Sequence, residues 1–242
     1  MEIIHNIVAS LLALSSIAGF IGCFVLLVRH HKNWKADLTY AFLLLTFALG
    51  CADVFLLRTN IVGRFIHVYH LPLWYTLSFG PLLFYYVKFS LFPSYEFRGS
   101  DLKHLILPTL QVFSVLYFTF QTRVTDDELW DAFIRPVYGP IEYGLFLIFL
   151  FIYTSLSYRY IRYKIALLRK RGTPEELALA SHLRRTVKYF VVLATAYSFF
   201  AIYDFIAYQF FNINLYEVEG FSFFGDISFA AILLWFVWRI QR

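Results

Sequence analysis

Residues Ile4 to Leu27, IHNIVASLLALSSIAGFIGCFVLL, decide the fold class of this chain. The run holds 24 residues without a lysine, arginine, aspartate or glutamate, and about 20 apolar residues are enough for a helix to cross the hydrocarbon of a bilayer. It also lacks the basic segment and the small-residue cleavage site of a signal peptide. We therefore expect a permanent membrane-spanning helix at the start of the chain.

Six further apolar runs of similar length follow, separated by clusters of charge. The chain is 60% hydrophobic and only 15% charged, whereas charged residues make up about a quarter of a soluble domain. The two cysteines, Cys23 and Cys51, lie inside apolar runs, which argues against a disulfide framework or a thiolate metal cluster. We predict an all-α, seven-helix transmembrane bundle forming a single domain over residues 1–242, with spans Ile4–Leu27, Leu38–Leu57, His70–Leu91, Leu102–Gln121, Val137–Tyr160, Thr186–Phe210 and Phe221–Trp238.

The positive charges indicate the orientation of these spans. If the first connector is cytoplasmic, 17 of the 21 lysine and arginine residues fall on that side, and cytoplasmic loops of membrane proteins accumulate such charge. The opposite side keeps only Arg58, Arg64, Arg123 and Arg135. We therefore expect a multi-pass protein of the bacterial inner membrane with its N-terminus outside and its C-terminus in the cytoplasm. Because the net charge of +5 is explained by topology, we expect no nucleic acid as a partner.

The longest cytoplasmic connector, residues 162–185, is expected to contain a helix of its own. Thr173, Pro174 and Glu176 form the pattern of a helix N-terminus, with Glu176 at the reciprocal position of a capping box. The helix should continue directly into the sixth span. We expect it to face lipid headgroups, and docking of a cytoplasmic protein partner is the alternative. Within the spans, Pro81, Pro108 and Pro140 are each expected to bend a helix.

Four acidic residues lie inside the predicted spans, all toward their outer ends: Asp53, Glu142, Asp204 and Asp226. An aspartate at mid-membrane costs roughly 2.5 to 3.5 kcal/mol, so such residues are functional candidates. We predict a polar pocket open to the outside, with local pairing near the headgroups as the alternative. The predicted ligand-binding residues are Asp53, Arg58, Glu142, Tyr143, Tyr203, Asp204 and Asp226.

A metal site is the second interpretation of this region. His67 and His70 are one helical turn apart if their segment is helical, and nearby carboxylates would complete a zinc site with an open water position. No glycine-rich phosphate loop, GxSxG motif or cysteine–histidine pair is present, and the last span has no lysine for retinal. No cofactor is therefore expected, and catalysis has little support.

One stretch, GPLLFYYVKFSLFPSYEFRGSDLKHLILPTLQ (residues 80–111), resembles the seven-helix membrane region of membrane-bound AraC-type regulators of Bacteroidetes. The matching residues are Gly80, Pro81, Tyr86, Val87, Asp101, Leu102, His104 and Pro108. The resemblance implies sensing of an external or membrane-borne signal, and it carries no catalytic residue. Such regulators continue into a DNA-binding domain, whereas this chain ends at Arg242. It is therefore expected to be either an isolated membrane domain or a free-standing relative that needs a partner.

These observations together predict a sensory or receptor-like membrane protein. We expect it to bind a small or lipid-like ligand from the outer side and to signal to a cytoplasmic partner or output domain. Two other classes compete with this prediction: a membrane-embedded, metal-dependent enzyme acting on lipids, and a scaffold subunit of a membrane complex.

Overall fold

The computed structural model of the chain describes residues 2–29, 33–61, 71–122, 133, 137–211, 213, 215 and 218–240. Helices dominate these residues, which contain no strand, so the predicted all-α class is confirmed. The described elements are α1 (Glu2–Val28), α2 (Trp34–Thr59), the 3-10 helix η1 (Thr76–Ser78), α4 (Phe79–Leu91), the 3-10 helix η2 (Gly99–His104), α5 (Ile106–Thr122), α6 (Gly139–Arg171), α7 (Pro174–Phe211) and α8 (Glu219–Ile240).

Five of these helices are long and apolar enough to cross a membrane, namely α1, α2, α6, α7 and α8. The other two α-helices are shorter, with 13 residues in α4 and 17 in α5. Large apolar side chains such as Leu14, Phe24 and Phe113 are exposed on the outside of the bundle, a surface that suits lipid and not water. The fold is therefore compatible with a multi-pass membrane helical bundle.

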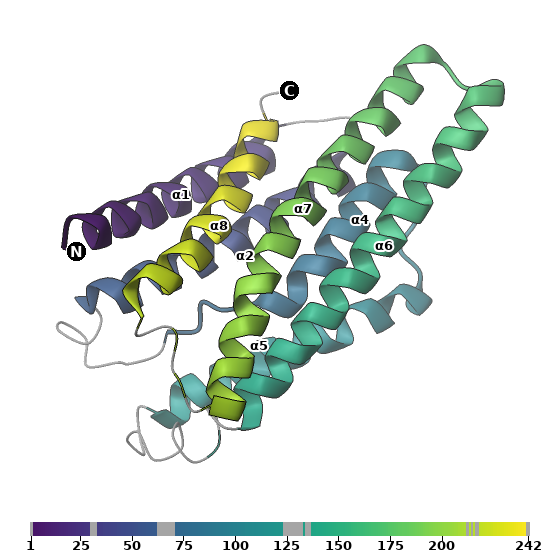
Figure 1. The fold of residues 1–242 in the computed structure, drawn as a ribbon. Coiled ribbons are helices and arrows are strands. Elements are labelled where there is room, and N and C mark those ends of the chain that lie inside the picture. The colour runs from purple at the N-terminus through teal and green to yellow at the C-terminus, as the bar shows by residue number, and fades with distance from the viewer. Residues whose placement is uncertain are drawn as a thin grey trace.

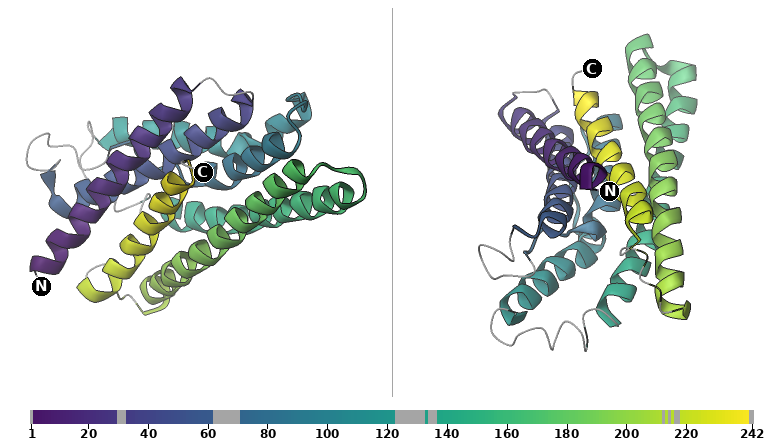
Figure 2. Two further views of the ribbon diagram at one scale, coloured as in Figure 1. Left: turned by 90° about the horizontal axis from the view of Figure 1, so that it is seen from above. Right: turned by 60° about the vertical axis from the view of Figure 1, so that its left-hand side comes forward.

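The helices pack in a ring (Figures 1 and 2). Each of α2, α4, α6, α7 and α8 contacts the next, and α8 closes the ring by contacting α2. Helix α1 lies outside the ring against α2 and α8, while α5 contacts η1 and η2. Helices α6 and α7 form a long antiparallel hairpin whose tip projects beyond the neighbouring helices. We name the end of the bundle at this tip the hairpin end, and the end where α2 stops and α8 begins the far end.

The turn at the tip of this hairpin has the cap that the sequence predicts. The backbone N–H of Thr173 donates to Oε2 of Glu176 at 3.1 Å, and the backbone N–H of Glu176 donates to Oγ1 of Thr173 at 3.3 Å. This reciprocal pair is a capping box, which begins α7 at Pro174. The helix then runs without interruption into the predicted sixth span, and α6 reaches Arg171 from the other side. The predicted connector over residues 162–185 is thus almost entirely helical.

The centre of the ring is filled with aromatic side chains. Phe47 of α2 stacks on Phe79 of α4 with 3.9 Å between ring centroids, and Phe229 and Phe236 of α8 pack against Phe47. Tyr40 donates a hydrogen bond of 2.6 Å to the backbone oxygen of Phe236. Its hydroxyl thereby finds the partner that a buried tyrosine needs, and it joins α2 to α8.

Small residues let α1 lie close to its neighbours. A Cβ atom added to Gly19 would lie 2.8 Å from Cβ of Ala48 and 3.0 Å from Cδ1 of Leu233, so only glycine fits between α2 and α8. Three residues earlier, Ser16 donates a hydrogen bond of 2.9 Å to the backbone oxygen of Ala48. Small residues and interhelical hydrogen bonds of this kind hold membrane helices together, because lipid supplies no hydrophobic drive between them.

The substitution Gly19→Ala should therefore destabilise the bundle by about 1 to 3 kcal/mol, the usual cost of overpacking. Thermal unfolding of the purified protein in detergent checks this. Gly144→Ala on α6 is the matched control, because nothing lies within 4 Å of a Cβ at that position; it should leave the unfolding temperature unchanged or raise it. Equal effects of the two substitutions would contradict the close approach of α1.

The three prolines expected to bend helices lie close to helix starts. Pro81, Pro108 and Pro140 lie in the first turns of α4, α5 and α6, respectively. The N–H groups of a first turn have no partner within the helix, so a missing donor costs nothing there. The bends expected at these positions stay a prediction.

The predicted third span, His70–Leu91, is also shorter than expected. Residues 71–75 are not helical, and helix begins only at Thr76 with η1 and continues as α4. Pro72 explains the break, because it restricts Leu71 to extended backbone and offers no N–H. His70 itself lies outside the described residues.

Candidate functional site

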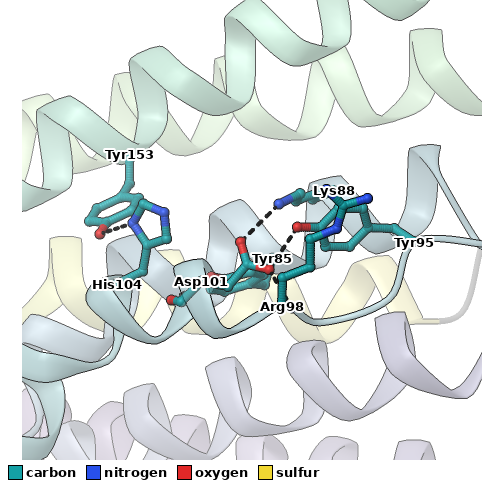
Figure 3. Close-up of polar contacts among 7 residues, drawn as sticks. All are labelled: Tyr85, Lys88, Tyr95, Arg98, Asp101, His104 and Tyr153. Carbon is teal, nitrogen blue, oxygen red and sulfur yellow. Dashed lines mark hydrogen bonds and ion pairs between the residues drawn. The ribbon is translucent and has the colours of Figure 1, made fainter.

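A buried ion pair joins α4 to the connector that follows it (Figure 3). Nζ of Lys88 lies 3.2 Å from Oδ1 of Asp101 in η2. Both side chains are buried, with only 7% of Lys88 and 4% of Asp101 exposed. A charged group in such a place is tolerated only when it is paired and hydrogen-bonded.

The remaining oxygens of Asp101 are also satisfied. Oδ2 accepts hydrogen bonds from the Tyr95 hydroxyl at 2.6 Å and from the Arg98 backbone N–H at 2.9 Å. The Asp101 backbone oxygen accepts from the Tyr85 hydroxyl at 3.0 Å. Burial would raise the pKa of Asp101, but the hydrogen bonds from Tyr95, Arg98 and Lys88, with the charge of Lys88, outweigh it and lower the pKa to about 2. The carboxylate is therefore ionised at neutral pH.

Aromatic rings surround the ammonium group of Lys88. Its Nζ atom lies 3.7 Å from the ring centroid of Tyr95, and 5.6 Å and 5.7 Å from those of Phe84 and Tyr85. These cation–π contacts are stronger where water is excluded. We name Lys88, Tyr85, Tyr95, Arg98 and Asp101 the η2 clasp, because together they hold the chain between α4 and α5 in place.

A separate contact ties η2 to α6. Nδ1 of His104 lies 2.8 Å from the hydroxyl of Tyr153, and the two rings are 5.5 Å apart. Beside them, Gly80 of α4 lets α6 approach, since a Cβ there would lie 3.0 Å from Cδ2 of Tyr153. The clasp and this contact thus connect α4, η2 and α6.

The sequence analysis gave Lys88 a different environment. It is one of the 17 lysine and arginine residues assigned to the cytoplasmic side, but its side chain is buried. The signal was present: Lys88 interrupts an apolar run, LLFYYVKFSLF, and a charge in such a run requires a partner. The nearest acids are Glu96 and Asp101, and η2 brings only Asp101 to it.

The substitution Asp101→Asn should destabilise the protein by about 3 to 5 kcal/mol, because it leaves the Lys88 charge buried without a counterion. Adding Lys88→Met should recover part of the loss, since the two effects are coupled. Thermal unfolding in detergent measures both. Glu96→Gln is the matched control, because Glu96 is exposed in the same connector, and it should change little.

The difference in stability between the wild-type protein and Asp101→Asn should also depend on pH. The pKa of Asp101 is about 2 in the folded protein, below its ordinary value of 3.8. The folded state therefore binds fewer protons, and the stability that Asp101 contributes is present above about pH 4 and lost as the pH falls toward 2. A difference that stayed constant from pH 7 to pH 2 would contradict an ionised, clasped carboxylate.

At the far end of the bundle, two of the predicted site residues do meet. Arg58 of α2 forms an ion pair and hydrogen bond with Asp226 of α8, and Asp226 is only 5% exposed. The guanidinium of Arg58 also lies over the ring of Phe223, 5.0 Å from its centroid. Arg58 thus supplies the counterion that the buried carboxylate of Asp226 requires.

Glu142 belongs to a second polar group at this end. Its Oε1 atom accepts hydrogen bonds from Oγ1 of Thr76 at 3.1 Å and from Nε2 of Gln111. Gln111 is buried, and its Oε1 atom accepts a bond of 3.0 Å from the backbone N–H of Leu77. These contacts connect η1, α5 and α6. The sequence analysis did not name Thr76 or Gln111, although a buried glutamine in an apolar helix is a signal of such a role.

The other predicted site residues lie in different surroundings. Asp53 is half-buried on α2, and no hydrogen bond or ion pair reaches it from the described residues. Asp204 is held by a backbone hydrogen bond from Leu215, just beyond α7. Tyr143 packs against Phe146 in the core. Among the described residues, no hydrogen bond or ion pair links Asp53 or Asp204 to Arg58 and Asp226, so these acids belong to separate polar groups.

The interior position expected for Tyr203 is wrong. Its side chain is 56% exposed and contacts Phe221 at the surface. Ala194, Tyr197 and Ser198 are buried and define the inward face of α7, and Tyr203 lies on a different face. The sequence could not show this, because lipid-facing and core-facing positions of α7 are both apolar.

Breaking the ion pair between Arg58 and Asp226 should lower the stability of the folded protein. Arg58→Met leaves Asp226 buried without a counterion and should lower stability by about 3 to 5 kcal/mol, measured by thermal unfolding in detergent. The double substitution Arg58→Met/Asp226→Leu should recover most of the loss. Arg185→Met, at an exposed position of α7, removes the same charge and should have little effect; a loss equal to that of Arg58→Met would contradict the buried pair.

The predicted metal ligands His67 and His70 lie outside the described residues. Within the described part of the chain, no group of three or more histidine, cysteine, aspartate or glutamate side chains is arranged to hold a metal ion. The free cysteines Cys23 and Cys51 are both buried. No described residue therefore adds support to the metal-dependent alternative.

Comparisons with models of protein families, with curated proteins and with solved structures find no match to this chain.

Proposed function

We propose that this protein is a receptor-like protein of the bacterial inner membrane with seven spans, its N-terminus outside and its C-terminus in the cytoplasm. It binds a small or lipid-like ligand at the far end and passes a helix rearrangement to the hairpin. The hairpin then acts on a cytoplasmic partner or output domain. Asp226, Arg58 and Glu142 are the residues that we expect to contact or respond to the ligand.

One observation carries this proposal: the same two helices reach both ends of the bundle. Helix α6 has 33 residues and α7 has 38, which gives lengths of roughly 50 and 57 Å. The hydrocarbon core is only about 30 Å thick, so both helices extend well beyond it. Glu142 is in the first turn of α6, and the basic residues Arg169 and Lys170 are in its last turn.

Charge supports the proposed orientation. The hairpin end carries Lys35, Lys103 and the basic residues of the hairpin, whereas the far end carries Asp53, Glu142, Asp204 and Asp226. Cytoplasmic segments are the positive ones. Helices α4 and α5, with roughly 20 and 25 Å of helix, supply the two shorter crossings that bring the total to seven.

The resemblance to membrane-bound AraC-type regulators agrees with this proposal. Two residues of the matching stretch, Asp101 and His104, fix η2 to α4 and α6. A displacement of α6 would therefore also move η2. Any such switch requires a ligand with different affinity for two states of the bundle.

The topology can be tested with single cysteines in a background where Cys23 and Cys51 are replaced by alanine. A membrane-impermeant maleimide should label Asn60→Cys on intact cells, and should label Lys170→Cys only after permeabilisation. Both positions are exposed, so accessibility reports sidedness and not burial. Labelling of Lys170→Cys from outside would overturn the orientation.

The receptor function can be tested by native mass spectrometry of the protein extracted from membranes. A bound non-protein mass should be present in wild type and reduced at least tenfold in Glu142→Gln, with Glu96→Gln as the control. A bound mass that persists in Glu142→Gln would contradict the role of Glu142, and another protein chain bound in place of a non-protein mass would favour the scaffold alternative.

A further inference from the structure

A basic groove lies between α6 and α7 in the projecting part of the hairpin. It has a volume of about 290 Å³ and is lined by Arg162, Ile165, Ala166, Arg169 and Arg184. Ile165 is buried and closes the floor against α7, together with Leu168 and Leu183 of the same apolar cluster. Two helices thus place three guanidinium groups around one hollow.

The hairpin supplies almost no negative charge to balance these groups. Residues 143–174 and 177–203 contain no aspartate or glutamate, so Glu175 and Glu176 at the tip are the only acids of the chain between Glu142 and Asp204. Glu176 is already engaged in the cap with Thr173. No ion pair reaches Arg162, Arg169 or Arg184 from the described residues. Arg184 donates one hydrogen bond of 3.3 Å to the hydroxyl of Tyr158, which leaves most of its donors available.

We propose that this groove binds a phosphate-bearing ligand, either the headgroup of an anionic lipid or a soluble phosphate compound. Arginine is suited to this chemistry because its planar guanidinium donates two parallel hydrogen bonds to phosphate oxygens. Arg162 and Arg169 approach from α6 and Arg184 from α7. A phosphate between them would also relieve the repulsion of like charges on the facing helices. The proposal does not depend on the far-end ligand.

The surroundings favour a lipid headgroup as the source. A second hollow, of about 480 Å³, lies beside the same part of α6 and is lined by Leu156, Arg159, Tyr160 and Tyr163. Tyrosines with a neighbouring arginine are typical of the level where hydrocarbon meets headgroups. Arg162 is half a turn beyond Tyr160, and Arg169 is roughly 14 Å beyond it along the helix. The groove therefore begins at the depth of the lipid phosphates and extends from there toward the tip of the hairpin.

The test uses the full chain in detergent micelles and native mass spectrometry. The probes are dioleoylphosphatidylglycerol and, as the uncharged comparison, dioleoylphosphatidylcholine; inorganic phosphate is tested separately by its effect on the unfolding temperature. The groove variants are Arg162→Gln/Arg184→Gln and Ala166→Trp, of which the second fills the groove without changing charge. The matched control is Lys170→Gln/Arg185→Gln, which removes two exposed charges from the same helices outside the groove.

Wild type should bind phosphatidylglycerol in preference to phosphatidylcholine. Both groove variants should lose at least tenfold in affinity, and the control should lose less than twofold. If phosphatidylglycerol shows no preference but inorganic phosphate stabilises wild type and not the groove variants, the proposal holds with a soluble ligand. Equal losses in the groove and control variants, binding of both lipids alike with no effect of phosphate, or no binding at all would overturn it.

Discussion

Polar side chains inside an apolar bundle must find their partners on neighbouring helices, because lipid has no donor or acceptor to give. This constraint accounts for the contacts that define the ring. Tyr40 bonds α2 to α8, and Ser16 bonds α1 to α2. Arg58 and Asp226 join α2 to α8 again at the far end. Each bond specifies a neighbour, whereas the surrounding leucines and phenylalanines would pack against almost any apolar surface.

Helix α4 shows how this constraint shapes the interior. It is the shortest of the described α-helices, and most of its side chains are buried. Lys88 near its end would be intolerable without Asp101, so η2 folds back to supply the carboxylate. Near the other end of α4, Gln111 of α5 accepts a hydrogen bond from η1 and donates one to Glu142. Helix α4 is therefore held at both ends by polar groups from the chain that follows it.

The sequence was sufficient for features that depend on composition and local pattern. The long helices follow from the apolar runs, and the cap at Thr173 follows from capping chemistry. It was insufficient for features that depend on helix rotation. In a membrane protein both the lipid-facing and the core-facing sides are apolar, so nothing in the pattern distinguished exposed Tyr203 from buried Tyr197. The burial of Lys88 was missed for a related reason, because a basic residue near the end of a span is also typical of a cytoplasmic loop.

The uninterrupted length of α6 has a mechanical consequence. A straight helix about 50 Å long transmits motion as a lever, and Tyr153, bonded to His104, lies close to its middle. If that contact serves as the pivot, a tilt of roughly 5° would swing each tip by about 2 Å in opposite directions. A movement of a few ångströms at one end of α6 would thus produce a movement of equal size in the opposite direction at its other end.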